Sequence, residues 1–66
     1  MIQYRFEAEY ANGEFCDDVT FDEMEAYGWL DECKNDTNCI WCKLSWTKTS
    51  GGICYDGATV EEFERK

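Results

Sequence analysis

Cysteines and carboxylates are the side chains of this 66-residue chain whose types and spacing could do chemistry. Cys39 and Cys42 form a CxxC pair, with Cys33 six residues before it and Cys54 twelve residues after it. Four thiolates can hold a zinc ion in a tetrahedral structural site. A thioredoxin-like redox motif instead needs its CxxC at the N-terminus of a helix, where the thiolate is stabilised. Sequence alternation predicts that this CxxC opens a strand, which disfavours redox catalysis.

The cysteines therefore have two remaining interpretations. The favoured one is that they are small apolar fillers of the core; this interpretation covers Cys16, Cys33, Cys42 and Cys54. The alternative is a zinc ion bound by Cys33, Cys39, Cys42 and Cys54. Against zinc, Cys39 and Cys42 would point to opposite faces of a strand unless the chain turns there.

Acidic residues dominate the charge of the chain. It contains 15 Asp and Glu against 6 Lys and Arg, for a formal net charge of -9. No basic residue lies between Phe6 and Cys33. The acids of that segment are Glu7, Glu9, Glu14, Asp17, Asp18, Asp22, Glu23, Glu25, Asp31 and Glu32. Their mutual repulsion destabilises a compact state, so a basic surface on a partner is one reason for a chain to carry them.

Several function classes are disfavoured by composition. There is no His, so no His-based catalytic triad and no His-ligated metal site can form. A Gly-rich phosphate loop is absent from the sequence. Lys43, Lys48, Arg65 and Lys66 are too few to follow a phosphate backbone. We therefore expect neither enzymatic activity nor direct nucleic-acid binding, and no cofactor apart from the zinc alternative.

The first third of the chain is predicted to be a hairpin. Residues 2–10 alternate between apolar and polar side chains, as a half-buried strand does. Asn12-Gly13 is a strong hairpin signal. A two-residue loop there places Phe6 opposite Val19 and puts Phe15 on the apolar face. Asp17 would fall on that face too, which indicates a bulge or an edge position.

A helix is predicted to follow, from residue 21 to residue 33 or 34. Thr20 is its expected N-cap, with Glu23 completing a capping box. Met24, Tyr27 and Leu30 are predicted to face the sheet. At about 100° per residue, a stripe of carboxylates that includes an exposed tryptophan lies on the opposite side of the helix. That stripe consists of Asp22, Glu25, Trp29 and Glu32.

Two further strands complete the expected architecture. Residues 39–48 alternate again, and Ile53 begins a fourth strand after a Gly51-Gly52 turn. Thr59 and Glu62 have capping-box spacing, which indicates a short C-terminal helical turn. We predict a single α+β domain over residues 1–66, with a four-stranded antiparallel sheet packed on one helix in the order ββαββ.

The acidic stripe is the predicted partner-binding surface, extended by carboxylates of the hairpin. The full set is Glu7, Glu9, Asp17, Asp18, Asp22, Glu25, Trp29 and Glu32. An ordinary solvated helix usually mixes charge signs in i,i+4 pairs, but this one has no base before Lys34. An exposed Trp29 would suit an interface anchor. A plain solvated face is the alternative for the stripe. For Trp29 the alternative is that its ring covers the edge of the helix or forms a homodimer contact.

In size, charge and αβ pattern the chain resembles the small acidic inhibitors of bacteriophages and mobile elements, including anti-CRISPR proteins and other DNA mimics. The resemblance implies a stoichiometric, non-catalytic phage protein in the bacterial cytoplasm. Its partner would be a host nucleic-acid-binding protein or a CRISPR effector complex. No secretion signal and no apolar run of about 20 residues is present, which agrees with a cytoplasmic rather than membrane location. A zinc-stabilised or homodimeric protein-interaction module is the alternative.

Overall fold

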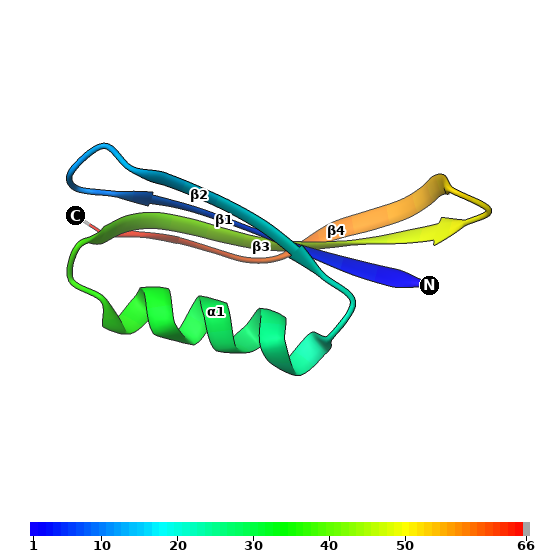
Figure 1. Ribbon diagram of the computed structural model, residues 1–66, viewed down its shortest axis with the longest axis horizontal. Coiled ribbons are helices and arrows are strands. Elements are labelled where there is room, and N and C mark those ends of the chain that lie inside the picture. Colours follow the sequence, from blue (N-terminus) through cyan, green and yellow to red (C-terminus); the bar gives the residue numbers. More distant parts are fainter. Residues whose placement is uncertain (66) are drawn as a thin grey trace.

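The computed structural model describes residues 1–65 as a four-stranded antiparallel sheet with one helix packed against one face (Figure 1). The elements in chain order are β1 (Ile2–Tyr10), β2 (Phe15–Thr20), α1 (Glu23–Asn35), β3 (Cys39–Ser50) and β4 (Ile53–Glu64). The strand order across the sheet is β2-β1-β3-β4. This confirms the predicted ββαββ fold. Within residues 1–65, α1 lacks the length and the apolar composition of a membrane-crossing helix.

The β1–β2 hairpin has a register one residue away from the predicted one. Phe6 lies opposite Asp18, not Val19. The loop is one residue longer than expected, because the Gly13 amide donates to the Tyr10 carbonyl and the Tyr10 amide donates to the Glu14 carbonyl. Gly13 has a φ of 90°, so the turn is of the three-residue type that ends in a left-handed glycine.

This single-residue shift moves the side chains of β2 to the opposite faces of the sheet. Phe15 and Val19, predicted to join the core, are both more than half exposed on the face that α1 leaves open. Asp17 also lies on the open face, so no bulge is needed to accommodate it. Asp18 and Cys16 instead point to the side of the sheet that carries α1.

The start of α1 also differs from the prediction. Asp22, not Thr20, is the N-cap, and its carboxylate accepts hydrogen bonds from the amides of Met24 and Glu25. The Thr20 hydroxyl, two residues before this cap, accepts from the Asp22 amide. Asp22 is the better cap here because it satisfies two amides at the positive end of the helix dipole.

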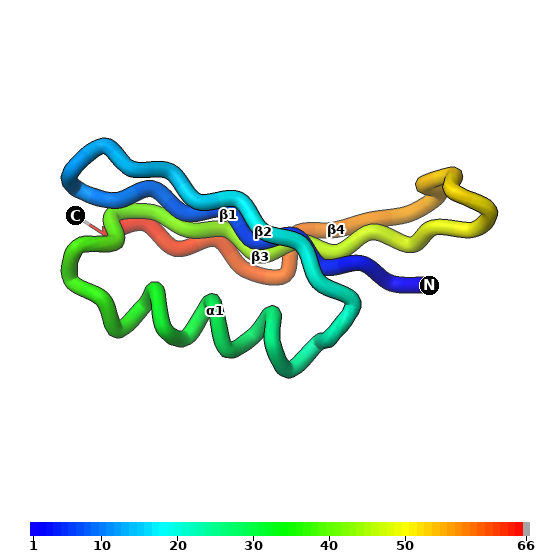
Figure 2. Tube along the Cα trace, in the orientation of Figure 1, coloured from blue at the N-terminus to red at the C-terminus, as the bar shows by residue number. Residues whose placement is uncertain are grey.

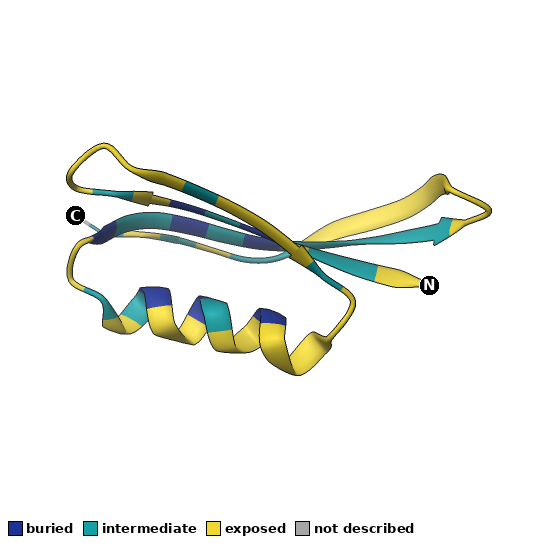
Figure 3. Ribbon diagram, viewed as in Figure 1, coloured by how far each residue is buried: buried dark blue, intermediate teal, exposed yellow. Residues whose placement is uncertain are grey.

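The buried stripe of α1 consists of Ala26, Leu30 and Cys33, at the i, i+4, i+7 spacing of an amphipathic helix. Leu30 was predicted to be buried, but Met24 is 84% exposed and Tyr27 is 43% exposed, so their predicted burial is wrong. The small side chains of Ala26 and Cys33 bring the helix close to the sheet. Figure 3 shows the buried residues gathered between α1 and the left half of the sheet.

β4 runs as a strand to Glu64, so the helical turn predicted at residues 59–62 is wrong. Thr59 pairs with Ser45 and Glu61 pairs with Leu44. Val60 between them is accommodated as a bulge, which keeps the strand hydrogen-bonded to β3 where a capping box would have ended it. The C-terminal end of β4 returns to the end of the molecule that holds the last turn of α1 (Figure 2).

Residues 45–58 of β3 and β4 form a long arm that extends past the N-terminal end of α1 (Figure 1). Gly51 and Gly52, with φ values of 60° and 83°, turn the chain at its tip. None of the residues in this arm is buried. The core that fixes the fold therefore lies at the other end, under the helix.

Leu44 is the largest side chain that is fully buried. Leu44→Ala should lower the free energy of unfolding by about 2–5 kcal/mol, the usual cost of such a cavity. Ile53→Ala, on the exposed arm, should change it by less than about 0.5 kcal/mol. Urea unfolding followed by circular dichroism measures both. Equal losses in the two variants would place the core elsewhere.

Candidate functional site

Carboxylates without a Lys or Arg partner gather along one flank of the molecule, where α1 runs beside β2. We call Asp18, Asp22, Glu25, Glu32 and Asp36 the acidic flank. Asp22, Glu25, Glu32 and Asp36 are three, seven and four residues apart, which places them on one side of α1 at about 100° per residue. Asp18 of β2 joins Glu32 and Asp36 around one cavity. Among residues 1–65, no Lys or Arg lies within salt-bridge distance of any of these five carboxylates.

The remaining carboxylates of the predicted set lie on the open face of the sheet. Glu7, Glu9 and Asp17 point away from α1. Arg5 donates to Asp17 through two nitrogens, at 3.1 and 2.6 Å, and lies 4.0 Å from Glu7. The structure therefore separates the predicted acids into two surfaces, one with neighbouring positive charge and one without.

Trp29 is not the exposed anchor that the sequence predicted. It is half-buried against the core, and its ring centroid lies 6.1 Å from that of Phe6, with the rings tilted by 46°. The tryptophan sits beside the buried stripe of α1 rather than opposite to it, so its ring fills the space between helix and β1. Only its outer edge can contribute to a contact surface.

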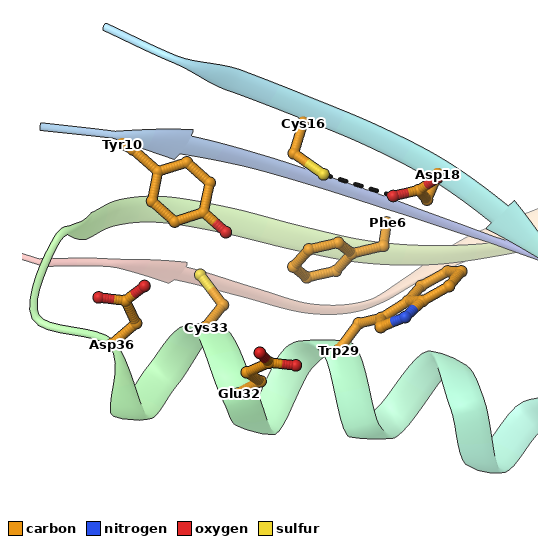
Figure 4. A pocket seen from close by; sticks show the side chains of 8 residues that line it. All are labelled: Phe6, Tyr10, Cys16, Asp18, Trp29, Glu32, Cys33 and Asp36. Carbon is orange, nitrogen blue, oxygen red and sulfur yellow. Dashed lines mark hydrogen bonds between the residues drawn. The ribbon is translucent and has the colours of Figure 1, made fainter. Parts of the chain in front are cut away.

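A cavity of about 160 Å³ lies between α1 and the β1–β2 hairpin (Figure 4). Phe6, Tyr10 and Trp29 supply aromatic rings to its wall. The carboxylates that line it are those of Asp18, Glu32 and Asp36. The Cys16 thiol donates to an Asp18 oxygen at 3.4 Å. Burial raises the pKa of Tyr10, and the nearby Cys16, Asp36 and Glu32 raise it further. Negative charge thus dominates this side of the molecule.

The second constellation is a cluster of three buried cysteines, Cys33, Cys39 and Cys42. Their sulfur atoms all lie within 4.8 Å of one another. Cys33 and Cys39 form a disulfide, and Cys42 is a free thiol. The sequence predicted cysteines that are apolar fillers or zinc ligands, and neither interpretation included this disulfide.

A bulge in β3 brings the two CxxC cysteines to the same face. Glu9 lies opposite Trp41, whereas Tyr10 lies opposite Cys39, so Ile40 is an extra residue in the strand. The prediction that Cys39 and Cys42 point to opposite faces is wrong for this reason. Both meet Cys33, which comes from the last turns of α1.

The other two cysteines lie outside the cluster. Cys54 is exposed on the arm, opposite Thr49, and Cys16 is half-buried on β2. The four-cysteine zinc set that included Cys54 is therefore wrong, and Cys54 is not a core filler. Cys33, Cys39 and Cys42 could together hold a metal ion, once the disulfide is open.

Two basic side chains lie around the cysteine cluster. The Arg65 guanidinium donates to the carbonyls of Cys39, Lys34 and Asp36, at 3.1, 3.0 and 3.3 Å. Lys34 forms an ion pair with Glu61. Burial raises the pKa of the Cys42 thiol, Lys34 and Arg65 counteract that rise, and Glu61 adds to it. Positive charge is thus available beside sulfur atoms that would become negative on losing a proton.

The disulfide should stabilise the fold. Closing a loop of this length is worth about 2 kcal/mol, so a thiol reductant should lower the melting temperature of the wild-type chain by roughly 10 °C. The double variant Cys33→Ser/Cys39→Ser should lose this sensitivity to reductant, and Cys54→Ser should keep it. Thermal unfolding with and without reductant tests this. A wild-type melting temperature that does not respond would contradict it.

The acidic flank and the cysteine cluster are the two features of the described chain that carry functional information. The flank is a surface without neutralising partners, and the cluster is a buried set of sulfur donors. They meet at Cys33, which lines the cavity and belongs to the cluster. Neither feature can be assigned by relationship, because no family model, no curated protein and no solved structure matches this chain.

Proposed function

We propose that this protein is a non-catalytic acidic inhibitor that binds a basic nucleic-acid-binding surface of a bacterial protein complex, in the manner of an anti-CRISPR DNA mimic. The observation that carries the proposal is the acidic flank. Five carboxylates lie on one side of the fold, and none has a salt-bridge partner among residues 1–65. Carboxylates left unpaired in this way are available to Lys and Arg side chains of another protein.

The arrangement of the flank fits a partner surface that is built to bind phosphates. From Asp22 to Asp36 the carboxylates follow the axis of α1. Asp22 and Glu25 are about one helical turn apart, as are Glu32 and Asp36, and about two turns separate Glu25 from Glu32. Nucleic acids also present a row of single negative charges. A row of Lys and Arg side chains that binds the phosphates of a nucleic acid can therefore contact the carboxylates of the flank.

The open face of the sheet is a weaker candidate for the same contact. Asp17 and Glu7 already interact with Arg5 there, and Lys43 lies opposite Glu7 in the register of β1 and β3. Such a mixed surface attracts a basic partner less than the flank does. We therefore place Asp18, Asp22, Glu25 and Glu32 at the interface, with Glu7, Glu9 and Asp17 outside it.

Binding through the flank would be competitive and sensitive to salt. Complementary charge accelerates association and loses its effect as ionic strength rises. The outer edge of Trp29 and the aromatic wall of the cavity would supply apolar contact at the centre of the interface, which lengthens the lifetime of a complex. The nucleic acid would then be excluded from the groove that the inhibitor occupies.

A pair of charge reversals tests this assignment. Glu25→Lys/Glu32→Lys changes the flank, and the matched control Glu9→Lys/Glu64→Lys makes the same change in net charge on the open face. We expect the wild-type chain to displace labelled duplex DNA from a purified complex, with CRISPR effectors tried first. The flank variant should need about 100-fold more protein, since close interfacial charge pairs are each worth at least about 1.5 kcal/mol.

Fluorescence anisotropy of the DNA provides the measurement, and circular dichroism checks that both variants fold. The control variant should displace DNA at about the wild-type concentration, within a factor of two or so, because rim charges outside a contact contribute little. Equal losses in the two variants would show that net charge matters and position does not. Full activity of the flank variant would reject the flank as the interface.

A second candidate function is a small interaction module held together by zinc. The three sulfur atoms of the cysteine cluster favour it, but structural zinc takes four ligands, and no fourth Cys, Asp or Glu of residues 1–65 joins the cluster. A zinc-stabilised module would therefore need a donor from a second chain, which links this candidate to a homodimer. A melting temperature that rises with protein concentration only when zinc is present would support it.

A further inference from the structure

The cysteine cluster has the dimensions of a three-coordinate metal site. Metal–thiolate bonds of about 2.3 Å place three sulfur atoms about 4 Å apart when the metal lies in their plane. The sulfur atoms of Cys33, Cys39 and Cys42 already lie within 4.8 Å of one another. Opening the disulfide would let Cys33 and Cys39 separate to that spacing, with Cys42 in place as the third donor.

The described chain supplies the cluster with three donors. No fourth Cys, Asp or Glu of residues 1–65 joins it, and the three residues are 2%, 0% and 0% exposed, so the cavity that Cys33 lines is the route by which water could reach it. Soft thiolates select Cu⁺ and Zn²⁺ over harder ions. Zn²⁺ prefers four ligands, whereas Cu⁺ can be satisfied by three. A single copy of this chain therefore fits monovalent copper better than zinc.

The charge around the cluster also fits. Three thiolates and one Cu⁺ carry a net charge of -2, which is costly in a buried position unless it is compensated. Arg65 is the main compensating group, with Lys34 beside it sharing its charge with Glu61. Arg65 is held by three carbonyls of residues 34–39, the segment that joins Cys33 to Cys39. Its guanidinium therefore lies beside the segment that links the two disulfide cysteines.

We propose that Cys33, Cys39 and Cys42 form a binding site for one monovalent copper ion that opens only when the Cys33–Cys39 disulfide is reduced. A dithiol reductant transfers two electrons and two protons to the disulfide and becomes a disulfide itself. The three thiols then release three protons and bind Cu⁺ as a tris-thiolate complex. The disulfide and the metal exclude each other, because both use the same two sulfur atoms. The proposal is independent of the acidic flank.

The experiment uses the whole chain, reduced with a dithiol, freed of reductant without oxygen and titrated with Cu⁺ supplied as its acetonitrile complex. Sulfur-to-copper charge-transfer absorption and competition with a copper chelator report binding. We expect one Cu⁺ per reduced chain and none in the disulfide form. Cys42→Ala should weaken binding by more than about tenfold, more than the loss of an outer-shell group, while Cys16→Ala and Cys54→Ala bind as wild type.

X-ray absorption of the wild-type adduct gives a readout that does not depend on any variant folding. Three sulfur neighbours at about 2.3 Å are expected, close to the distance for zinc thiolates. A shell of two sulfurs, or of sulfur mixed with oxygen or nitrogen, would overturn the three-thiolate site. Copper uptake by the disulfide form, or an equal loss in Cys54→Ala, would also overturn it. DNA displacement by the copper-free chain tests the acidic flank separately.

Discussion

The fold depends on a small core: of the eight buried residues in the part of the chain that the structure describes, three are cysteines. Two others, Ala8 and Ala26, are alanines, and side chains of this size let α1 lie close to the sheet. A core so limited in apolar area leaves a 66-residue chain with little margin, and repulsion among its acids lowers that margin further. The disulfide between Cys33 and Cys39 ties the last turns of the helix directly to β3. It compensates for what the core lacks.

The order and type of the main elements could be predicted from sequence because alternation and Asn-Gly chemistry are local signals. Their register could not. A two-residue and a three-residue loop both suit Asn12-Gly13, and only hydrogen bonding at Tyr10 decides between them. The choice exchanged Val19 for Asp18 opposite Phe6. The strand conformation at the end of β4 could not be predicted either. The capping-box pattern there is a local signal, whereas the pairing with β3 depends on residues far away in the sequence.

The candidate site was only partly predictable for the same reason. The acidic stripe of α1 follows from helical periodicity, and the structure keeps its members together. The direction in which the stripe faces does not follow, because Met24 and Tyr27 compete for the sheet with the smaller Ala26 and Cys33, and tertiary packing settles the rotation of the helix. Trp29 was misplaced as a result. The cysteine cluster required knowledge of the bulge at Ile40, for which the sequence carries no clear signal.

The arm of β3 and β4 gives the molecule an uneven distribution of stability. The chain extends over 38 Å in its longest direction, and the helix and the disulfide lie toward one end. Residues 45–58 have no buried side chain, so strand hydrogen bonds and surface contacts alone hold them. Segments of this kind open at a small fraction of the global unfolding free energy. The amide hydrogens near Gly51 should therefore exchange with solvent long before those of Leu44, and a protease would find its first cleavage site at the tip of the arm.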